Sequence, residues 1–252
     1  MTPYFGRQRP QPDPEYEAIM NILHVTCSPR GQISESYKLS RKIIDHLLKR
    51  EPAALLVNRE IGGGTIPHID EGYASALGAA QPSPAETSPQ GSMSLSEQLI
   101  RELEQSDVVI IATPMHNFTV PSSLKAWIDH IVRVRRTFTM TAAGRFATLR
   151  DRPVFVAVSS GGRFSGERAH QPDFLTPYLK AVLGIIGLHD LTFFSVEGAG
   201  PGSDALVEAS ARTDRALQQH FSSLDPPSPS GDVIPVGGVN ADGHDRGLSF
   251  CC

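Results

Sequence analysis

The sequence lacks the segments that would place a protein in a membrane or in an oxidising compartment. No apolar run approaches the roughly 20 residues that a helix needs to cross a bilayer, and the amino-terminal segment has no apolar signal core. Only three cysteines are present, and Cys251 and Cys252 are adjacent, so we expect no disulfide framework and a core position for Cys27. These absences predict a cytoplasmic protein that does not bind membranes.

Strong net charge and metal-ligand spacing are also missing. The formal net charge is −4, which provides no general attraction to nucleic acid. Nine histidines are scattered along the chain without an HxxxH or HExxH arrangement. We therefore expect neither a nucleic-acid partner nor a metal site.

Two common glycine-rich nucleotide signatures are absent where they would be needed. The loop after the first predicted strand, at residues 26–36, carries no GxGxxG, and the chain contains no GxxxxGK[ST]. This argues against tightly bound NAD or ATP at that loop.

The two ends of the chain differ in composition from its middle. Residues 1–20 and 225–252 are rich in proline and polar residues, and they contain too little apolar surface to offset the entropy lost on ordering. We expect disordered extensions on either side of one domain at residues 21–224. Residues 79–94 have a similar composition and predict a long surface loop inside that domain.

Between the extensions, apolar runs alternate with amphipathic stretches. The predicted strands are residues 21–27, 54–60, 108–114, 153–160 and 191–197, and the predicted helices are residues 36–50, 96–105, 122–134, 172–187 and 203–221. This alternation predicts an α/β fold with a parallel sheet covered on both faces. In a flavodoxin-like three-layer sandwich of strand order 2-1-3-4-5, the carboxyl ends of the first, third and fourth strands come together, where such folds bind ligands.

Serine hydroxyls cluster in the loop after the first predicted strand. Ser28, Ser34 and Ser36 surround the start of the following helix. Free backbone amides and the helix dipole make such a position suitable for a phosphate group. The alternative for Ser34 is a simple helix cap.

The loop after the third predicted strand offers a different set of groups. Met115 and Phe118 provide apolar surface, Asn117 provides an amide, and His116 lies between them. These groups suit a flat ring with polar edges, such as a flavin. The alternative is a plain connector punctuated by prolines.

Paired glycines follow the fourth predicted strand, in the run Ser159, Ser160, Gly161 and Gly162. Glycine lets the backbone approach a ligand ring closely and present amides to it, although a plain turn is an equal alternative for this loop alone. A phosphate at the first loop, a ring over the third and the ring edge at the fourth would be the arrangement of bound FMN.

At these residues the chain resembles the flavodoxin-like family of FMN-dependent NADH:quinone oxidoreductases and azoreductases. The resemblance covers about residues 21–220 and rests on Ser28 followed by Ser34, Glu35 and Ser36, on PMHNF at residues 114–118 and on SSGG at residues 159–162. LTPYL at residues 175–179 and GIIG at residues 184–187 also match.

The resemblance implies FMN as the cofactor, held by the residues of these three motifs, and NADH as the electron donor in a ping-pong cycle. Asn117 is expected to bond the flavin ring, and Gly161 and Gly162 to face its pyrimidine edge. The flavin carries the chemistry, so no catalytic side chain is expected. The resemblance further implies a homodimer, quinones and aromatic azo compounds as acceptors, and a role in resistance to quinone stress.

Two positions depart from the family pattern. His116 replaces a tyrosine and introduces a group that titrates near neutral pH, although it is also consistent with a side chain that only points to water. Ser160 replaces an arginine, and Arg163 is a candidate to compensate for the lost cation.

Other interpretations remain open. A non-enzymatic flavodoxin-like electron carrier is the main alternative, and a flavin-binding regulator is a third. Arg133, Arg135 and Arg136 are either contacts for dinucleotide phosphates or a solvated helix end. Trp127 is expected in the core or at an interface, and His130 at the surface or at an interface.

Overall fold

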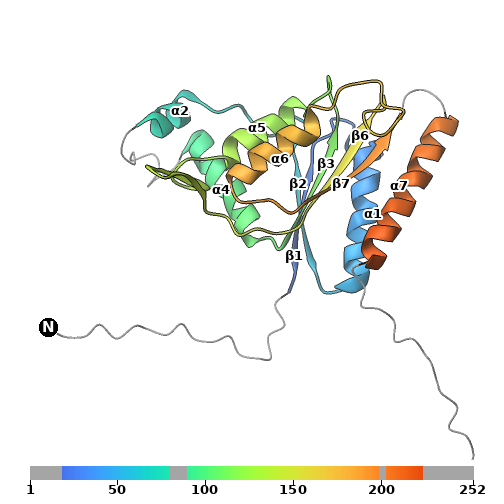
Figure 1. Ribbon diagram of the computed structural model, residues 1–252. Helices are drawn as coiled ribbons and strands as arrows, with labels where there is room; N and C mark the ends of the chain where they lie inside the picture. Colours follow the sequence, from blue (N-terminus) through green and yellow to red (C-terminus); the bar gives the residue numbers. More distant parts are fainter. Residues whose placement is uncertain (1–18, 80–89, 199–202, 224–252) are drawn as a thin grey trace, which may run out of the picture.

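A five-stranded parallel sheet forms the middle layer of the structure (Figure 1). The computed structural model describes residues 19–79, 90–198 and 203–223. The predicted extensions lie outside the described residues, apart from residues 19 and 20, and so does most of the predicted loop at residues 79–94. The strands are β1 (Asn21–Thr26), β2 (Leu55–Glu60), β3 (Val108–Pro114), β6 (Val154–Ser160) and β7 (Leu191–Glu197). Their order, β2-β1-β3-β6-β7, confirms the predicted order.

The central strand β3 is buried on both of its faces. Successive side chains of a strand point to opposite sides, so Val109 and Ile111 pack into one apolar cluster and Ile110 into the other. Every residue of β3 before Pro114 is buried. The continuous apolar run therefore forms a two-sided central strand, as predicted.

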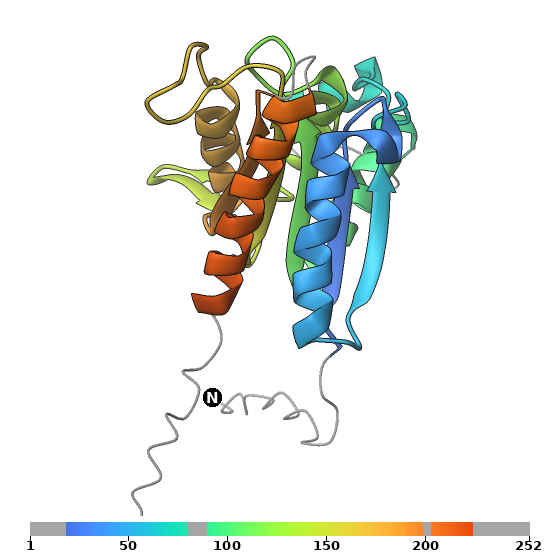
Figure 2. The ribbon, with the colours of Figure 1, turned by 90° about the vertical axis from the view of Figure 1, so that its right-hand side faces the viewer.

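Helices cover both faces of the sheet. Figure 2 shows α1 (Glu35–Arg50) and α7 (Ser203–Ser223) side by side on one face, where Lys42 of α1 pairs with Asp214 of α7 at 2.5 Å. The opposite face is covered by α4 (Gly91–Gln105), α5 (Ser122–Ile131) and α6 (Leu175–Ile185). The structure is thus the predicted three-layer sandwich. No helix among the described residues is both long enough and apolar enough to span a bilayer.

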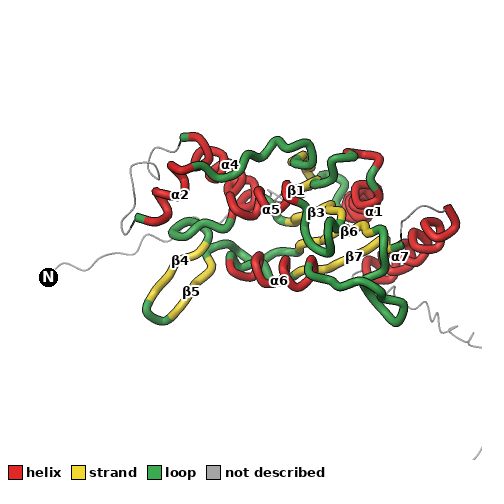
Figure 3. Tube along the Cα trace, turned by 90° about the horizontal axis from the view of Figure 1, so that it is seen from above, coloured by secondary structure: helices red, strands yellow, loops and turns green. Residues whose placement is uncertain are grey.

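Several elements differ from the sequence-based expectation. Helix α4 begins at Gly91, inside the stretch predicted as loop, because the carboxylate of Asp70 accepts the Ser92 amide at 2.9 Å. Asp70 also caps the unpredicted helix α2 (Glu71–Gly78) by accepting the Tyr73 amide. A second unpredicted unit is the antiparallel hairpin of β4 (Phe138–Thr141) and β5 (Gly144–Ala147), which extends away from the sheet in Figure 3.

Candidate functional site

The three predicted loops open side by side at the carboxyl edge of the sheet. β1 aligns Thr26 with Ala112 of β3, and β3 aligns Pro114 with Ser159 of β6. The ladder continues into the loops, because Cys27 donates to the Ala112 carbonyl at 2.9 Å and Met115 to the Ser159 carbonyl at 2.8 Å. The parallel register therefore brings the loops after β1, β3 and β6 together, as the sequence predicted. Cys27 itself is buried in the core, and burial raises the pKa of its thiol.

The loop after β1 forms a compact start to α1. The Ser34 hydroxyl accepts the Tyr37 amide at 3.3 Å and donates to the Gly31 carbonyl at 2.8 Å, so Ser34 does cap the helix. The fully buried Ser36 hydroxyl lies 3.4 Å from that of Ser34. The amides of Glu35 and Ser36 belong to the first helical turn, where no carbonyl of the helix can accept them. The loop thus combines a helix cap with unpaired amides, and such a set of donors suits an anion.

Two further residues define this loop. The Glu35 carboxylate pairs with Lys38 at 2.7 Å, and because a carboxylate has no proton to donate, only the Glu35 backbone amide is available to an anion. Gly62, in the turn after β2, packs so closely that a Cβ would lie 2.1 Å from the Ser28 carbonyl oxygen. This role of Gly62 was not predicted from the sequence, although the run of three glycines at residues 62–64 was a signal for it.

The loop after β3 is a tight and strained hairpin turn. His116 and Thr119 exchange two backbone hydrogen bonds, at 2.9 and 3.0 Å. The two residues between them both have positive φ, +48° at Asn117 and +67° at Phe118. Left-handed backbone costs a residue such as phenylalanine on the order of 1 kcal/mol or more, and such strain concentrates at functional sites. The amides of Asn117 and Phe118, and the Asn117 carboxamide, have no hydrogen-bond partner among the described residues.

The loop after β6 is tied to this turn through Gln171. The Gln171 side-chain amide donates to the Ser160 hydroxyl at 2.8 Å and approaches the Met115 sulfur at 3.3 Å. A Cβ at Gly162 would lie 2.1 Å from the Gln171 side-chain oxygen, so a larger residue there would displace the Gln171 side chain. Ser160 is therefore buried in a contact between the two loops.

The glycines of this loop present free donors. The amides of Gly161, Gly162 and Arg163 have no acceptor in the part of the chain that the structure describes. The candidate site thus has unpaired amides on three adjacent loops, next to serine hydroxyls at the first. This donor set fits FMN, which needs donors for a phosphate and for the polar edge of its ring. A pocket of about 410 Å³ adjoins the site, with His116 and Pro29 among its lining residues.

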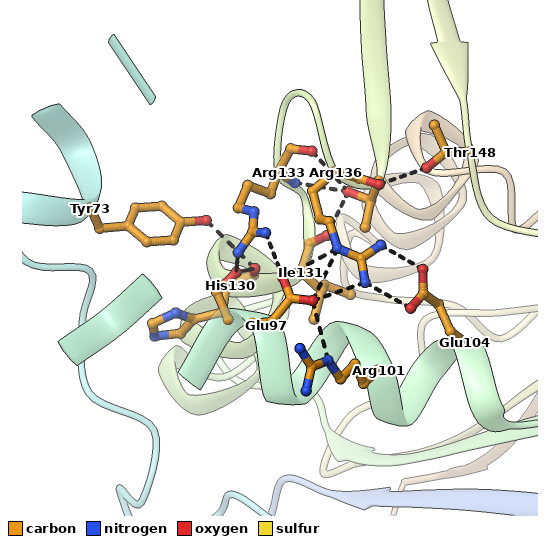
Figure 4. A network of polar contacts seen from close by, with 11 residues as sticks. Tyr73, Glu97, Arg101, Glu104, His130, Ile131, Arg133, Arg136 and Thr148 are labelled. Carbon is orange, nitrogen blue, oxygen red and sulfur yellow. Dashed lines mark hydrogen bonds and ion pairs between the residues drawn. The ribbon is translucent and has the colours of Figure 1, made fainter. Parts of the chain in front are cut away.

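Two arginines of the cluster after α5, Arg133 and Arg136, are paired with carboxylates of α4 (Figure 4). Arg133 is buried and donates to Glu97 at 2.7 Å and to Ser96 at 3.0 Å. Arg136 bonds the same carboxylate at 3.1 Å. Burial alone would raise the pKa of Glu97, but the hydrogen bonds from the two guanidinium groups outweigh it and lower the pKa to about 2. The expected solvated helix end is therefore wrong, and contact with dinucleotide phosphates stays an untested prediction.

The expected placement is confirmed for Trp127 but not for His130. Trp127 is buried in the core, which confirms one of its two expected placements. His130 is also buried, and its Nε2 lies 3.0 Å from the Pro67 carbonyl oxygen, so the expected surface position is wrong. Within the described ranges, no group of three or more histidine, cysteine, aspartate or glutamate side chains is arranged to hold a metal ion.

Similarity to known proteins covers the whole described domain. A family model described as a flavodoxin-like fold matches residues 20–221. The FMN-dependent NADH:quinone oxidoreductase 4 of Pseudomonas fluorescens is 45% identical over 206 residues, which are 81% of this chain and 98% of that protein. The FMN-dependent NADH:quinone oxidoreductase 5 of Burkholderia lata is 47% identical over 189 residues, which are 75% of this chain and 90% of that protein.

Solved structures share the fold at lower identity. An azoreductase from Bacillus anthracis superposes with a TM-score of 0.68 at 18% identity and covers 81% of this chain and 100% of its own. An FMN-dependent NADH-azoreductase from the same species, solved in complex with FMN, superposes with a TM-score of 0.64 at 20% identity, with the same coverage. At these identities the similarity establishes the fold alone.

Proposed function

We propose that this chain, which belongs to the flavodoxin-like family of FMN-dependent NADH:quinone oxidoreductases, transfers two electrons from NADH to quinones with FMN as its cofactor. The observation that carries the proposal is the convergence of three loops with unpaired backbone amides at one edge of the sheet. That arrangement suits one ligand with a phosphate at one end and a polar-edged ring at the other.

The first loop would hold the phosphate of FMN. The amides of Glu35 and Ser36 are free to donate to it, and the Ser36 hydroxyl would turn to it from its long 3.4 Å contact with the Ser34 hydroxyl, while Ser34 and Ser28 shape the loop. The amino end of α1 adds the favourable end of its helix dipole, so no lysine is required.

The other two loops would hold the ring. The Asn117 carboxamide and the amides of Gly161 and Gly162 are the donors available to ring nitrogens and oxygens. Bound FMN would supply the redox chemistry, accepting a hydride from NADH and passing two electrons to the acceptor. Donors fixed in place before reaction would stabilise the negative charge that reduction adds to the cofactor.

Exposed aromatic rings extend the proposal to the acceptors and the assembly. Phe118 and Phe174 are 44% and 59% exposed, and the Phe174 amide donates to the Phe118 carbonyl at 3.0 Å. Two exposed phenylalanines joined through their backbones beside the turn suit flat aromatic acceptors and contact with a second subunit. We accordingly propose quinones and aromatic azo compounds as acceptors, a homodimer as the assembly, and the cytoplasm, where NADH is available, as the location.

Flavin reconstitution tests the binding part of this proposal. The purified full chain is stripped of ligand, incubated with FMN and desalted, and the bound flavin is measured by absorbance against protein concentration. We expect about one FMN per subunit and a yellow protein. A chain that stays colourless after reconstitution would contradict the proposal.

A further inference from the structure

A buried carboxylate at the end of β7 holds the glycine loop from behind. Glu197 is only 4% exposed, yet it has no cationic partner among the described residues. One of its oxygens accepts the amides of Phe164 at 2.8 Å and Ser165 at 3.0 Å. The other accepts the hydroxyls of Ser165 at 2.5 Å and Ser195 at 2.8 Å. Three of these four hydrogen bonds join β7 to the loop after β6.

A backbone contact reinforces this connection. The amide of Gly198, the residue after Glu197, donates to the Gly162 carbonyl at 3.3 Å. A Cβ at Gly198 would lie 3.4 Å from the Arg163 Nε, so the loop packs directly over the end of the strand. The loop is therefore held at Gly162 by the backbone and at residues 164 and 165 by the carboxylate.

The charge of this carboxylate is retained despite its burial. Burial alone would raise the pKa of Glu197, but the donated hydrogen bonds together outweigh it and hold the pKa below its usual value. Four donors pointing at one carboxylate define its position, and each would lose its acceptor if the side chain were removed. The cost would be a displaced loop and not merely a lost surface contact.

We infer that Glu197 is a positioning residue that sets where Gly161 and Gly162 present their amides to the flavin ring. The inference rests on the proposed function, because the ring is the group that those amides would meet. Glu197 itself lies behind the loop and bonds only loop and strand donors. Its expected effect is thus on the ring end of the cofactor and not on the phosphate end.

Three variants separate positioning from simple structural support. Glu197→Ala removes the acceptor. Glu197→Gln preserves the pattern, because its oxygen can accept the two amides and its NH₂ can donate to the two serine oxygens. The control is Asp151→Ala, because Asp151 similarly accepts the amides of Arg152 and His189, both at 2.9 Å, at the opposite edge of the sheet.

The measurement is the affinity of each apoprotein for FMN and for riboflavin, which lacks the phosphate, by quenching of flavin fluorescence. Thermal unfolding of each apoprotein is followed in parallel. We expect E197A to weaken the binding of both flavins by the same factor, at least about tenfold, since two buried amides lose their acceptor. E197Q is expected within about threefold of wild type. D151A is expected to lower the melting temperature without changing either affinity.

The outcomes distinguish the inference from the proposed function. A wild-type protein that binds neither flavin would overturn both. A wild-type protein that binds both, with E197A binding them equally well or with E197Q as impaired as E197A, overturns only the role of Glu197. If E197A does not fold, Glu197→Asp retains the charge but reaches less far. It is then expected to weaken both flavins several-fold, and unchanged affinity would contradict the inference.

Discussion

The Arg133 guanidinium and the Glu97 carboxylate face each other at 2.7 Å between the end of α5 and helix α4 (Figure 4). The Arg133 side chain is only 5% exposed, so this ion pair lies inside the protein. The basic run after α5 is thus part of the scaffold, with Arg133 and Arg136 committed to carboxylates of α4.

Removing Glu97 should therefore destabilise the fold without affecting NADH. Glu97→Ala leaves a buried guanidinium without its carboxylate, which typically costs about 3 kcal/mol of unfolding free energy. Urea denaturation measures this loss. Arg101 also pairs with Glu97 but is exposed, so Arg101→Ala should lower the unfolding free energy by less than about 0.5 kcal/mol. The KM for NADH of the folded E97A enzyme should equal that of wild type. A large increase in this KM would indicate that the arginine cluster does contact the dinucleotide.

Replacing Ser36 should affect the phosphate end of the cofactor only. Ser36→Ala removes a buried hydroxyl at the first turn of α1, and a hydrogen bond to a charged group is worth about tenfold or more in affinity. We expect FMN to bind more weakly by that factor and riboflavin to bind as before, both measured by fluorescence quenching. Ser40→Ala, one turn later and bonded to His24, is the matched control and should leave both affinities unchanged. Equal losses for the two flavins would place the phosphate elsewhere.

His116 should influence acceptors and not cofactor binding. The turn that contains it is held by backbone bonds to Thr119, while its exposed side chain lines the adjoining pocket. His116→Tyr should therefore retain FMN affinity within about twofold but change the relative kcat/KM values across a panel of quinones. Unchanged relative kcat/KM values, together with an unchanged pH profile, would show that the His116 side chain has no role in acceptor choice.

A buried histidine should make the fold sensitive to mild acid. His24 bonds Asn58 at 3.1 Å and Ser40 at 2.8 Å, and burial is the main reason that its pKa falls from 6.5 to about 4. Between these values the unfolded chain binds the proton and the folded protein does not, so stability is full above pH 6.5 and falls as the pH decreases towards 4. Urea denaturation should show a loss of roughly 2 kcal/mol between pH 6.5 and 5. His24→Gln should flatten this slope, and identical slopes in the two proteins would rule out the assignment.

The sheet and its site edge were predictable because their signals are local. Apolar runs such as residues 108–112 mark buried strands, and parallel pairing alone brings the loops that follow β1, β3 and β6 to one edge. The serines, the PMHNF turn and the paired glycines then lie where the pattern predicted them. The direction of each backbone amide in the PMHNF turn was harder to predict from the sequence. It depends on the positive φ at Asn117 and Phe118, which are not glycines.

Other features depend on contacts between distant residues. Arg133 is buried only because Glu97, 36 positions earlier, approaches it from α4. Glu197 reaches a loop more than 30 residues away in sequence, and nothing around it in the chain indicates that partner. The hairpin of β4 and β5 has strands of four residues, too short and too exposed for alternation to predict.

Steady-state turnover of the FMN-reconstituted chain tests the central claim most directly. NADH oxidation is followed at several fixed concentrations of benzoquinone, together with a reaction that lacks quinone. We expect NADH consumption to depend on the quinone and double-reciprocal plots to be parallel, because NADH gives up its hydride and NAD⁺ leaves before the acceptor binds. NADH consumption that is indifferent to added quinone, in a protein that holds its FMN, would contradict the account.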